Sequence, residues 1–107
     1  MTLIKKVKEN LIHYNLWKSV QEHDSKVLSG FPPSKLIIDD EDNQEEWVVP
    51  KLMTDKDFSI EEIESWFVQI EKISTKRPAR ITIGLVNDDA TIVYYFIHDG
   101  IVKPRQN

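Results

Sequence analysis

The sequence predicts an α+β protein in which a mixed or antiparallel sheet is flanked by two helices. Two segments, one at the N-terminus and one at residues 60–73, have apolar residues at the spacing of an amphipathic helix. The last third of the chain is rich in β-branched and aromatic residues, as strands are. The order helix, strands, helix, strands favours helices packed on a sheet. We expect residues 1–107 to form one domain, because 107 residues suffice for one and not comfortably for two.

The first helix is expected to begin after Thr2, a residue type that fits the N-cap position. Its apolar stripe recurs at helical spacing and consists of Leu3, Ile4, Val7, Leu11 and Ile12. Asn15 should mark its exit. Residues 16–22 fit either a strand or a continued helix, and we favour the strand.

The middle of the chain is marked by breakers and by charge. Gly30-Phe31-Pro32-Pro33 predicts a break, after which residues 36–38 suit a short strand. A solvated loop should follow, because like charges at high density repel one another. Trp47 begins another strand, and Pro50 confines that strand to an edge or ends its pairing. The acidic residues of the loop are Asp39, Asp40, Glu41, Asp42, Glu45 and Glu46.

The second helix has the clearest local signature. Ser59 and Glu62 form a capping box, in which each side chain satisfies a free backbone N–H, and Phe58 and Ile63 occupy the positions of a hydrophobic staple. The helix should end before Pro78, because the residue ahead of a proline is pushed out of the helical region. The predicted apolar stripe is Ile60, Ile63, Trp66, Phe67, Ile70 and Ile73.

The last third is predicted to form strands. Apolar residues at 81, 83 and 85 alternate with their neighbours, and a turn is expected at residues 87–90. Residues 92–97 are apolar at every position, so we expect this strand to be covered on both faces, by its own helices or by another subunit. Asp99-Gly100 suits a tight turn, and residues 101–103 suit a short return strand.

Composition excludes several classes of function. The net charge is −4, but without the six loop acids 12 acidic residues face 14 basic ones, a balance of +2, which does not announce a nucleic-acid-binding face. The absence of cysteine excludes disulfides, thiolate metal sites and a cysteine nucleophile. No apolar run approaches the roughly 20 residues that span a bilayer, and the N-terminus has no signal-peptide pattern.

Motifs for catalysis and for cofactors are lacking. There is no G-x-S-x-G elbow, no H-E-x-x-H pair and no glycine-rich phosphate loop, and the acidic loop lacks the EF-hand pattern. We therefore expect no catalytic residue, no metal and no cofactor. Metal-independent RNA cleavage needs only a base, an acid and a cation, for which Tyr94, Tyr95, His98 and Lys103 are candidates.

A basic cluster lies between the second helix and the strand that follows it. It consists of Lys76, Arg77 and Arg80. These side chains could contact RNA phosphates. They could equally form a solvated loop whose cations favour a helix C-terminus. The two readings have similar weight.

Two stretches near the C-terminus are distinctive: LVNDDATIVYYF at residues 85–96 and GIVKP at residues 100–104. They resemble the tRNA-intron endonuclease family, and within it the small non-catalytic structural subunits of the eukaryotic tRNA-splicing endonuclease, of the fungal Sen-fifteen type. The N-terminal pattern Val7-x-x-Asn10-Leu11-x-x-Tyr14-x-x-Trp17 and Pro32-Pro33-x-Lys35-Leu36 are also similar. The resemblance covers nearly the whole chain and implies the fold of that family's C-terminal domain.

The resemblance also implies how such a chain works. Its last strands would pair edge to edge with a catalytic subunit, forming a heterodimer. The acidic turn at residues 87–90 would dock this pair onto a second subunit pair, forming a heterotetramer that removes introns from pre-tRNA. The implied partner-binding residues are Asp88, Asp89, Ile92, Tyr94, Phe96, Ile101 and Val102. Self-pairing of the isolated chain is left open, and the implied location is the nucleus or, in yeasts, the cytosolic face of the mitochondrial outer membrane.

In this family, catalysis belongs to subunits with a Tyr, a His and, further on, a Lys just before the strand that leads into the acidic turn. Here no histidine precedes residues 76–80 in the expected turn, and His98 falls after the acidic turn. The resemblance therefore implies a scaffold subunit without catalytic activity. Two alternatives remain: a divergent metal-independent RNA-cleaving enzyme that uses Tyr94, His98 and Lys103, or a generic interaction module that binds partners through a β edge.

Overall fold

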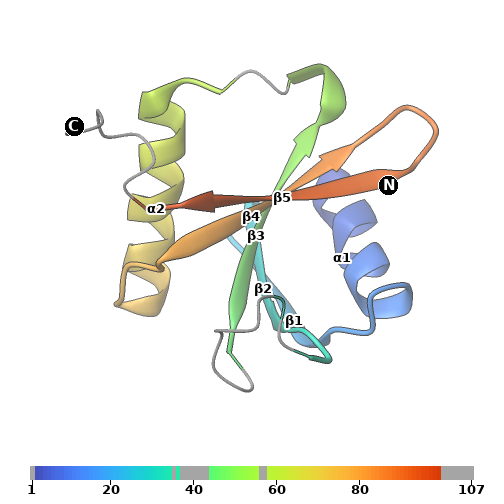
Figure 1. Cartoon of the computed structure of the whole chain (residues 1–107), viewed down its shortest axis with the longest axis horizontal. Coiled ribbons are helices and arrows are strands. Elements are labelled where there is room, and N and C mark those ends of the chain that lie inside the picture. Colours follow the sequence, from blue (N-terminus) through green and yellow to red (C-terminus); the bar gives the residue numbers. More distant parts are fainter. Residues whose placement is uncertain (1, 35, 37–43, 56–57, 100–107) are drawn as a thin grey trace.

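The computed structural model describes residues 2–34, 36, 44–55 and 58–99. Within these residues two α-helices and five strands form an α+β fold, which confirms the predicted class (Figure 1). In chain order the elements are α1 (Leu3–His13), β1 (Lys18–His23), β2 (Val27–Phe31), β3 (Glu46–Leu52), the 3-10 turn η1 (Met53–Asp55), α2 (Ile60–Ser74), β4 (Arg80–Val86) and β5 (Ile92–His98).

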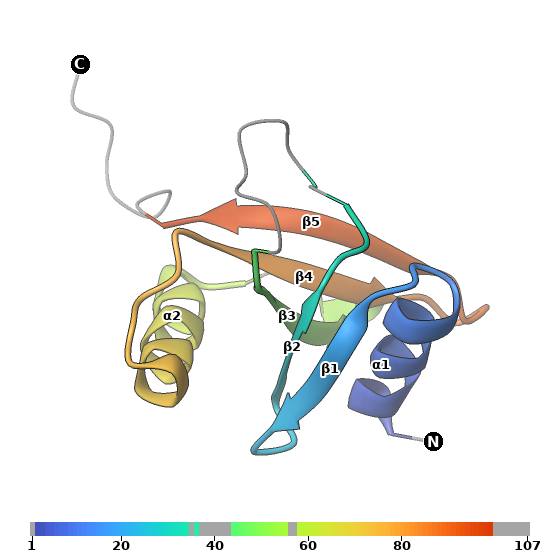
Figure 2. The same cartoon turned by 90° about the horizontal axis from the view of Figure 1, so that it is seen from below.

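The five strands form one mixed sheet in the order β1-β2-β3-β4-β5. Neighbouring strands are antiparallel except for β3 and β4, which are parallel because the chain returns through α2 between them. The two helices cover opposite faces of the sheet, as the two views show (Figures 1 and 2). Because β1 and β5 lie at the two ends of the strand order, they are the edge strands of the described sheet.

The first helix follows the predicted pattern. The Thr2 hydroxyl accepts a hydrogen bond from the Lys5 backbone N–H at 3.3 Å, and the helix ends at His13. Its buried residues are on one face, as the apolar spacing predicted. Leu16, between α1 and β1, has a φ of 60°, so the chain turns sharply before the predicted strand begins at Lys18.

The second helix confirms half of the capping box directly, because the Ser59 hydroxyl accepts from the Glu62 N–H at 3.0 Å. Its end also agrees, since α2 stops at Ser74, ahead of Pro78. Ile60 was wrongly assigned to the apolar stripe. It is 59% exposed and lines a surface hollow with charged residues of the same helix instead of facing the sheet.

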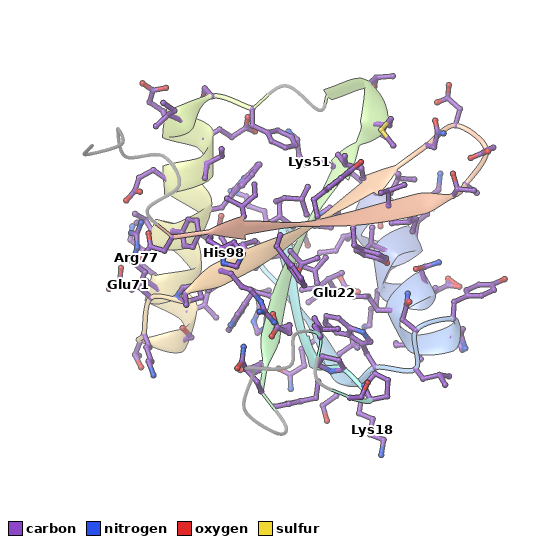
Figure 3. The ribbon with its side chains drawn as sticks, viewed as in Figure 1. Lys18, Glu22, Lys51, Glu71, Arg77 and His98 are labelled. Carbon is purple, nitrogen blue, oxygen red and sulfur yellow. The ribbon has the colours of Figure 1, made fainter. Side chains whose placement is uncertain are left out.

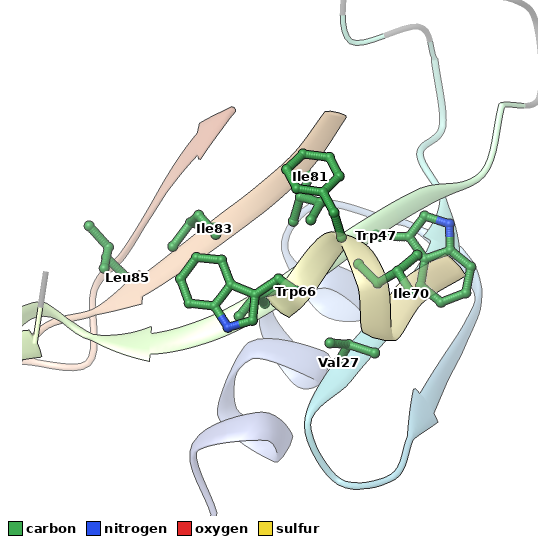
Figure 4. Close-up of a cluster of buried hydrophobic side chains, with 9 residues drawn as sticks. Val27, Trp47, Trp66, Ile70, Ile81, Ile83 and Leu85 are labelled. Atoms are coloured by element: carbon green, nitrogen blue, oxygen red, sulfur yellow. The ribbon is translucent and has the colours of Figure 1, made fainter. Parts of the chain in front are cut away.

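The core has two halves, one on each face of the sheet. On the face of α2, that helix packs against alternate residues of the strands, as Figure 4 shows for Trp66 and Ile83. On the other face, α1 packs against the intervening residues, including Val48 and Val86. The first half consists of Val27, Trp47, Val49, Trp66, Phe67, Ile70, Ile81, Ile83 and Leu85, and the second of Ile4, Val7, Leu11, Trp17, Leu28, Val48 and Val86.

Tertiary contacts decide the roles of two residues that were predicted to interrupt strands. The predicted break is confirmed at Pro32 and Pro33, which follow the end of β2 at Phe31, but Gly30 itself lies within the strand. A side chain at position 30 would meet Trp17 at 3.1 Å, so glycine is needed there for close packing and not for a turn. β3 is a central strand, yet its pairing with β2 reaches only from Glu46 to Val48, so Pro50 lies beyond the end of that ladder.

Some sequence predictions fall outside the described residues. They are most of the strand at residues 36–38, most of the acidic loop and the return strand at residues 101–103. Glu46, the last residue assigned to the solvated loop, is described and is buried in β3, so that part of the prediction is wrong. In the described part of the chain, no helix is both long and apolar enough to cross a membrane.

Candidate partner-binding edge

β5 forms one edge of the sheet and carries three of the residues predicted to bind a partner. Ile92, Tyr94 and Phe96 alternate along it and face the side of α1. Ile92 and Tyr94 are half-buried against α1, whereas Phe96 lies beyond it and is 37% exposed. Ile101 and Val102 lie outside the described residues.

Tyr94 is held within the chain. Its hydroxyl donates a 2.7 Å hydrogen bond to the Asn10 side-chain oxygen of α1, and its burial raises the pKa of the phenol above the usual range. The same Asn10 oxygen accepts a 2.8 Å hydrogen bond from Asn15, so one side chain links β5 to the turn after α1. The Tyr94 ring lies over Gly84, where an added Cβ would approach it to 3.2 Å.

The opposite face of β5 is open. Val93 is 39% and Tyr95 54% exposed on the side of α2, which leaves this outermost strand only partly covered. Among the described residues, the chain's own helices therefore do not cover β5 on both faces. This excludes α1 and α2 as the source of the burial that was expected for this strand. Val93 and Tyr95 were not among the residues predicted to bind a partner, because an uninterrupted apolar run does not indicate which face of the strand is exposed.

The turn between β4 and β5 presents two carboxylates to solvent. Asp89 accepts hydrogen bonds from the Thr91 hydroxyl at 2.6 Å and the Thr91 N–H at 3.0 Å, and these bonds lower the pKa of its carboxyl group. Asp88 is exposed, and its N–H donates to the Asn87 side chain. Asp89 thus shapes the turn, while the Asp88 carboxylate projects from it.

The three basic residues of the predicted RNA contact occupy different environments. Lys76 is exposed and makes no ion pair among the described residues. Arg77 bridges Glu64 and Asp99. Arg80 is buried and pairs with Glu46 at 2.8 Å, so its charge is directed into the protein.

The candidate catalytic residues are not brought together by the described part of the chain. Tyr94 and His98 lie on the same strand four residues apart, which is about 13 Å along an extended backbone and beyond hydrogen-bond reach. Lys103 lies outside the described residues. No group of three or more metal-ligating side chains is found among the described residues.

Two surface hollows, of about 460 and 740 Å³, flank α2. The smaller also reaches the first turn of α1 and contains the ion pair of Lys51 and Glu62, which are 3.0 Å apart. Neither hollow has a histidine or tyrosine among its described lining residues, so neither contains the combination of tyrosine, histidine and lysine considered above.

The fold and the edge define a class: a small α+β protein whose mixed sheet, in the described part of the chain, ends in an apolar edge strand, β5. Within that class the particular family can be stated. The chain belongs to the Sen15 protein family, whose model matches residues 6–107. The resemblance seen in the sequence is thereby confirmed.

Three fungal relatives are similar to this chain. The tRNA-splicing endonuclease subunit SEN15 of Eremothecium gossypii is 33% identical over 107 residues, which cover 94% of this chain and 87% of the relative. The probable tRNA-splicing endonuclease subunit sen15 of Schizosaccharomyces pombe is 35% identical over 91 residues, which cover 76% of this chain and 60% of that protein. The probable subunit tsp-1 of Neurospora crassa is 56% identical over 32 residues, which are 30% of this chain and 14% of that protein.

Proposed function

We propose that this chain is a non-catalytic subunit of a tRNA-splicing endonuclease that pairs with a catalytic subunit along the outer edge of β5. The names of its relatives support a role as a subunit in tRNA splicing. Its part in removing introns from pre-tRNA is then to hold the catalytic subunits in place. The observation that carries the pairing surface is the difference between the two sheet edges.

The β1 edge is protected against pairing with another chain, and the β5 edge is not. β1 is interrupted by an irregularity between Lys18 and Gln21, with Ser19 at a φ of 55°, and Glu22 draws Lys5 towards it. Bulges and charges of this kind block strand addition. β5 pairs with β4 without interruption over seven residues and has no charge from residue 92 to residue 97.

Two hydrogen bonds show which backbone groups face the free edge. Asn87 N–H donates to Thr91 O at 2.8 Å, and Asp99 N–H donates to Ala79 O at 2.7 Å. Hydrogen-bonded pairs alternate along an antiparallel ladder, so both bonds place the N–H and C=O groups of residues 93, 95 and 97 towards β4. The groups of residues 92, 94, 96 and 98 consequently point outward, where an added strand would meet them.

The side chains of β5 differ between its two faces. On the side of α1, Tyr94 is already anchored and needs no partner to cover it. On the side of α2, Val93 and Tyr95 remain exposed. A partner that adds a strand would bury these two side chains and so gain apolar contact beside the backbone hydrogen bonds.

The acidic turn at residues 87–90 is proposed to dock this pair onto a second pair of subunits. Its exposed Asp88 carboxylate suits a basic pocket, and electrostatic complementarity of this kind fixes partner and register. Of the three basic residues, Lys76 is the one whose exposure suits a contact with pre-tRNA.

Hydrogen exchange followed by NMR tests the pairing edge. We expect the amides of Tyr94 and Phe96 to exchange rapidly in the free chain and to become protected by a tenfold or larger factor in complex with a catalytic subunit. The amides of Val93 and Tyr95 should be protected in both states, which makes them internal controls. Tyr95→Lys should weaken the complex, whereas Gln21→Lys on the β1 edge should not.

Four outcomes would count against the proposal or point to another mode of pairing. A complex that leaves Tyr94 and Phe96 exchanging rapidly would place the interface elsewhere. No complex from two folded proteins would favour the generic β-edge module, and protection of the free chain at high concentration would reveal self-pairing through the same edge. Cleavage of pre-tRNA by the pure chain, lost on His98→Ala, would favour the enzyme reading.

A further inference from the structure

Arg77 lies in the connection between α2 and β4, and its side chain forms hydrogen bonds with two acidic residues elsewhere in the chain. Its guanidinium donates to both carboxylate oxygens of Glu64 on α2, from Nη1 at 3.0 Å and from Nη2 at 2.8 Å. It also donates to both oxygens of Asp99, from Nε and from Nη2, each at 3.0 Å. The guanidinium carbon lies 5.0 Å from the centre of the Phe67 ring, which is in the core.

This geometry uses most of what an arginine can donate. The four hydrogen bonds engage four of the five N–H donors, and paired bonds of this kind fix orientation as well as distance. The hydrogen bonds that Arg77 donates to Glu64 and to Asp99 raise the pKa of the guanidinium, which stays charged. Two carboxylates already neutralise Arg77, so it has little left to offer an RNA phosphate.

The position of Asp99 shows which parts of the chain the Arg77 side chain connects. Asp99 directly follows β5, and its N–H is bonded to Ala79 of the same connection. Its side chain is bonded to Arg77. Both the backbone and the side chain at the end of β5 are thus tied to a segment that is itself tied to α2. Figure 3 shows Arg77 beside α2, near the end of β5 where His98 lies.

An edge strand needs such a tie more than a central strand does. Among the described residues β5 has a hydrogen-bonded neighbour only on the side of β4, and strands with few contacts open locally at low free-energy cost. A frayed strand must be ordered when a partner binds, which weakens the complex. A strand held extended in advance avoids that loss.

We propose that Arg77 is a positioning residue that holds the end of β5 against α2 and so presents the strand's outer edge to a partner subunit in a fixed orientation. The inference rests on the proposed function for the identity of the partner. The hold on β5 itself is a property of the free chain.

Arg77→Gln tests the hold in the free, full-length chain. We expect exchange of the Ile97 and Asp99 amides to accelerate at least tenfold, while Val93, on the same ladder near the other end, is unchanged. Asp99→Asn should reproduce the effect. Arg77→Lys keeps the charge without the fork and should restore protection only in part. Unchanged exchange at residues 97 and 99 in Arg77→Gln would overturn the inference.

Affinity for the catalytic subunit tests the consequence. Arg77→Gln should weaken the complex about tenfold, and Lys76→Gln, with the same change of charge one residue away, should leave it unchanged. Faster exchange with unchanged affinity would make Arg77 merely structural and overturn the positioning role. Loss of pre-tRNA binding in both variants, with subunit pairing intact, would favour the RNA reading. No binding by the unaltered chain would overturn the proposed function, and with it the partner half of this inference.

Discussion

Glu46 and Arg80 form an ion pair that neither residue's place in the sequence suggests. Glu46 ends a run of acids and Arg80 belongs to a basic cluster, so both were expected in solvated segments. Instead, their side chains are 3% and 7% exposed, and the Arg80 guanidinium lies 4.5 Å from the centre of the Phe96 ring. This pair joins three strands, because it links β3 to β4 and stacks on β5.

Breaking this pair should cost more than breaking an exposed one. Glu46→Gln leaves a buried cation without its main counter-charge, so we expect the free energy of unfolding to fall by roughly 3 kcal/mol in urea titrations. Glu62→Gln is the matched control. Its pair with Lys51 is partly exposed, and its loss should cost about 1 kcal/mol or less.

A double variant separates the pair from its packing. Glu46→Met with Arg80→Met should recover most of the stability that Glu46→Gln loses, because apolar replacement of both partners avoids an uncompensated charge. Equal losses in Glu46→Gln and Glu62→Gln would show that the Arg80 charge does not depend on Glu46.

At the scale of the element, the two ends of α2 differ in quality. The N-terminus has a favourable cap, since Ser59 bonds the Glu62 N–H. At the C-terminus, Thr75 adopts a φ of 65°, a left-handed conformation that β-branched residues rarely adopt. Glycine is the usual residue there, because it has no Cβ to clash.

Thr75→Gly should therefore stabilise the protein. We expect the free energy of unfolding to rise by roughly 0.5–1 kcal/mol, since relief of the left-handed strain outweighs the greater freedom of glycine in the unfolded chain. Thermal and urea unfolding would measure the change. Glu71→Gly, one turn earlier on the exposed side of α2, should destabilise by about 1 kcal/mol instead. Destabilisation by Thr75→Gly would show that the threonine side chain contributes more than its backbone costs.

At the scale of the whole molecule, β5 and the acidic turn at its start give the chain two separate surfaces. One is an edge, which is proposed to bind through backbone pairing and apolar contact, and the other is a charged tip. Because the tip lies at the hairpin end of β4 and β5, a change there can leave the edge intact (Figure 1).

Asp88→Lys separates these surfaces. We expect the fold and the first heterodimer to be unchanged, while the affinity of the two pairs for each other falls roughly tenfold through charge repulsion. Light scattering after size exclusion, at low and high salt, would measure it, and the loss should shrink at high salt because exposed charges are screened. Glu71→Lys, an equal change of charge on α2, is the control. Assembly that ignores Asp88→Lys would remove the turn from the interface.

Much of the fold could be predicted because its signals are local. The Ser59 cap, the apolar spacing of both helices outside Ile60 and the turn at residues 87–90 act over a few residues, and each was found where expected. The prediction failed at Gly30 and at Ile60, where a distant tryptophan or the position of the sheet decides the environment. For the candidate site, Ile92, Tyr94 and Phe96 lie on an edge strand of the described sheet, but the sequence indicated neither that β5 is an edge strand nor which of its faces is exposed.

The sequence by itself determined the fold class, the helix boundaries, the last hairpin and membership of the family. Only the tertiary structure decided which edge is open, which face of β5 is bare and where the basic residues are directed. The physical reason is the range of the forces involved. Caps and periodicities join neighbours, whereas the contacts that define the site join Arg77 to Asp99, Arg80 to Glu46 and Tyr94 to Asn10, residues that are 22, 34 and 84 positions apart.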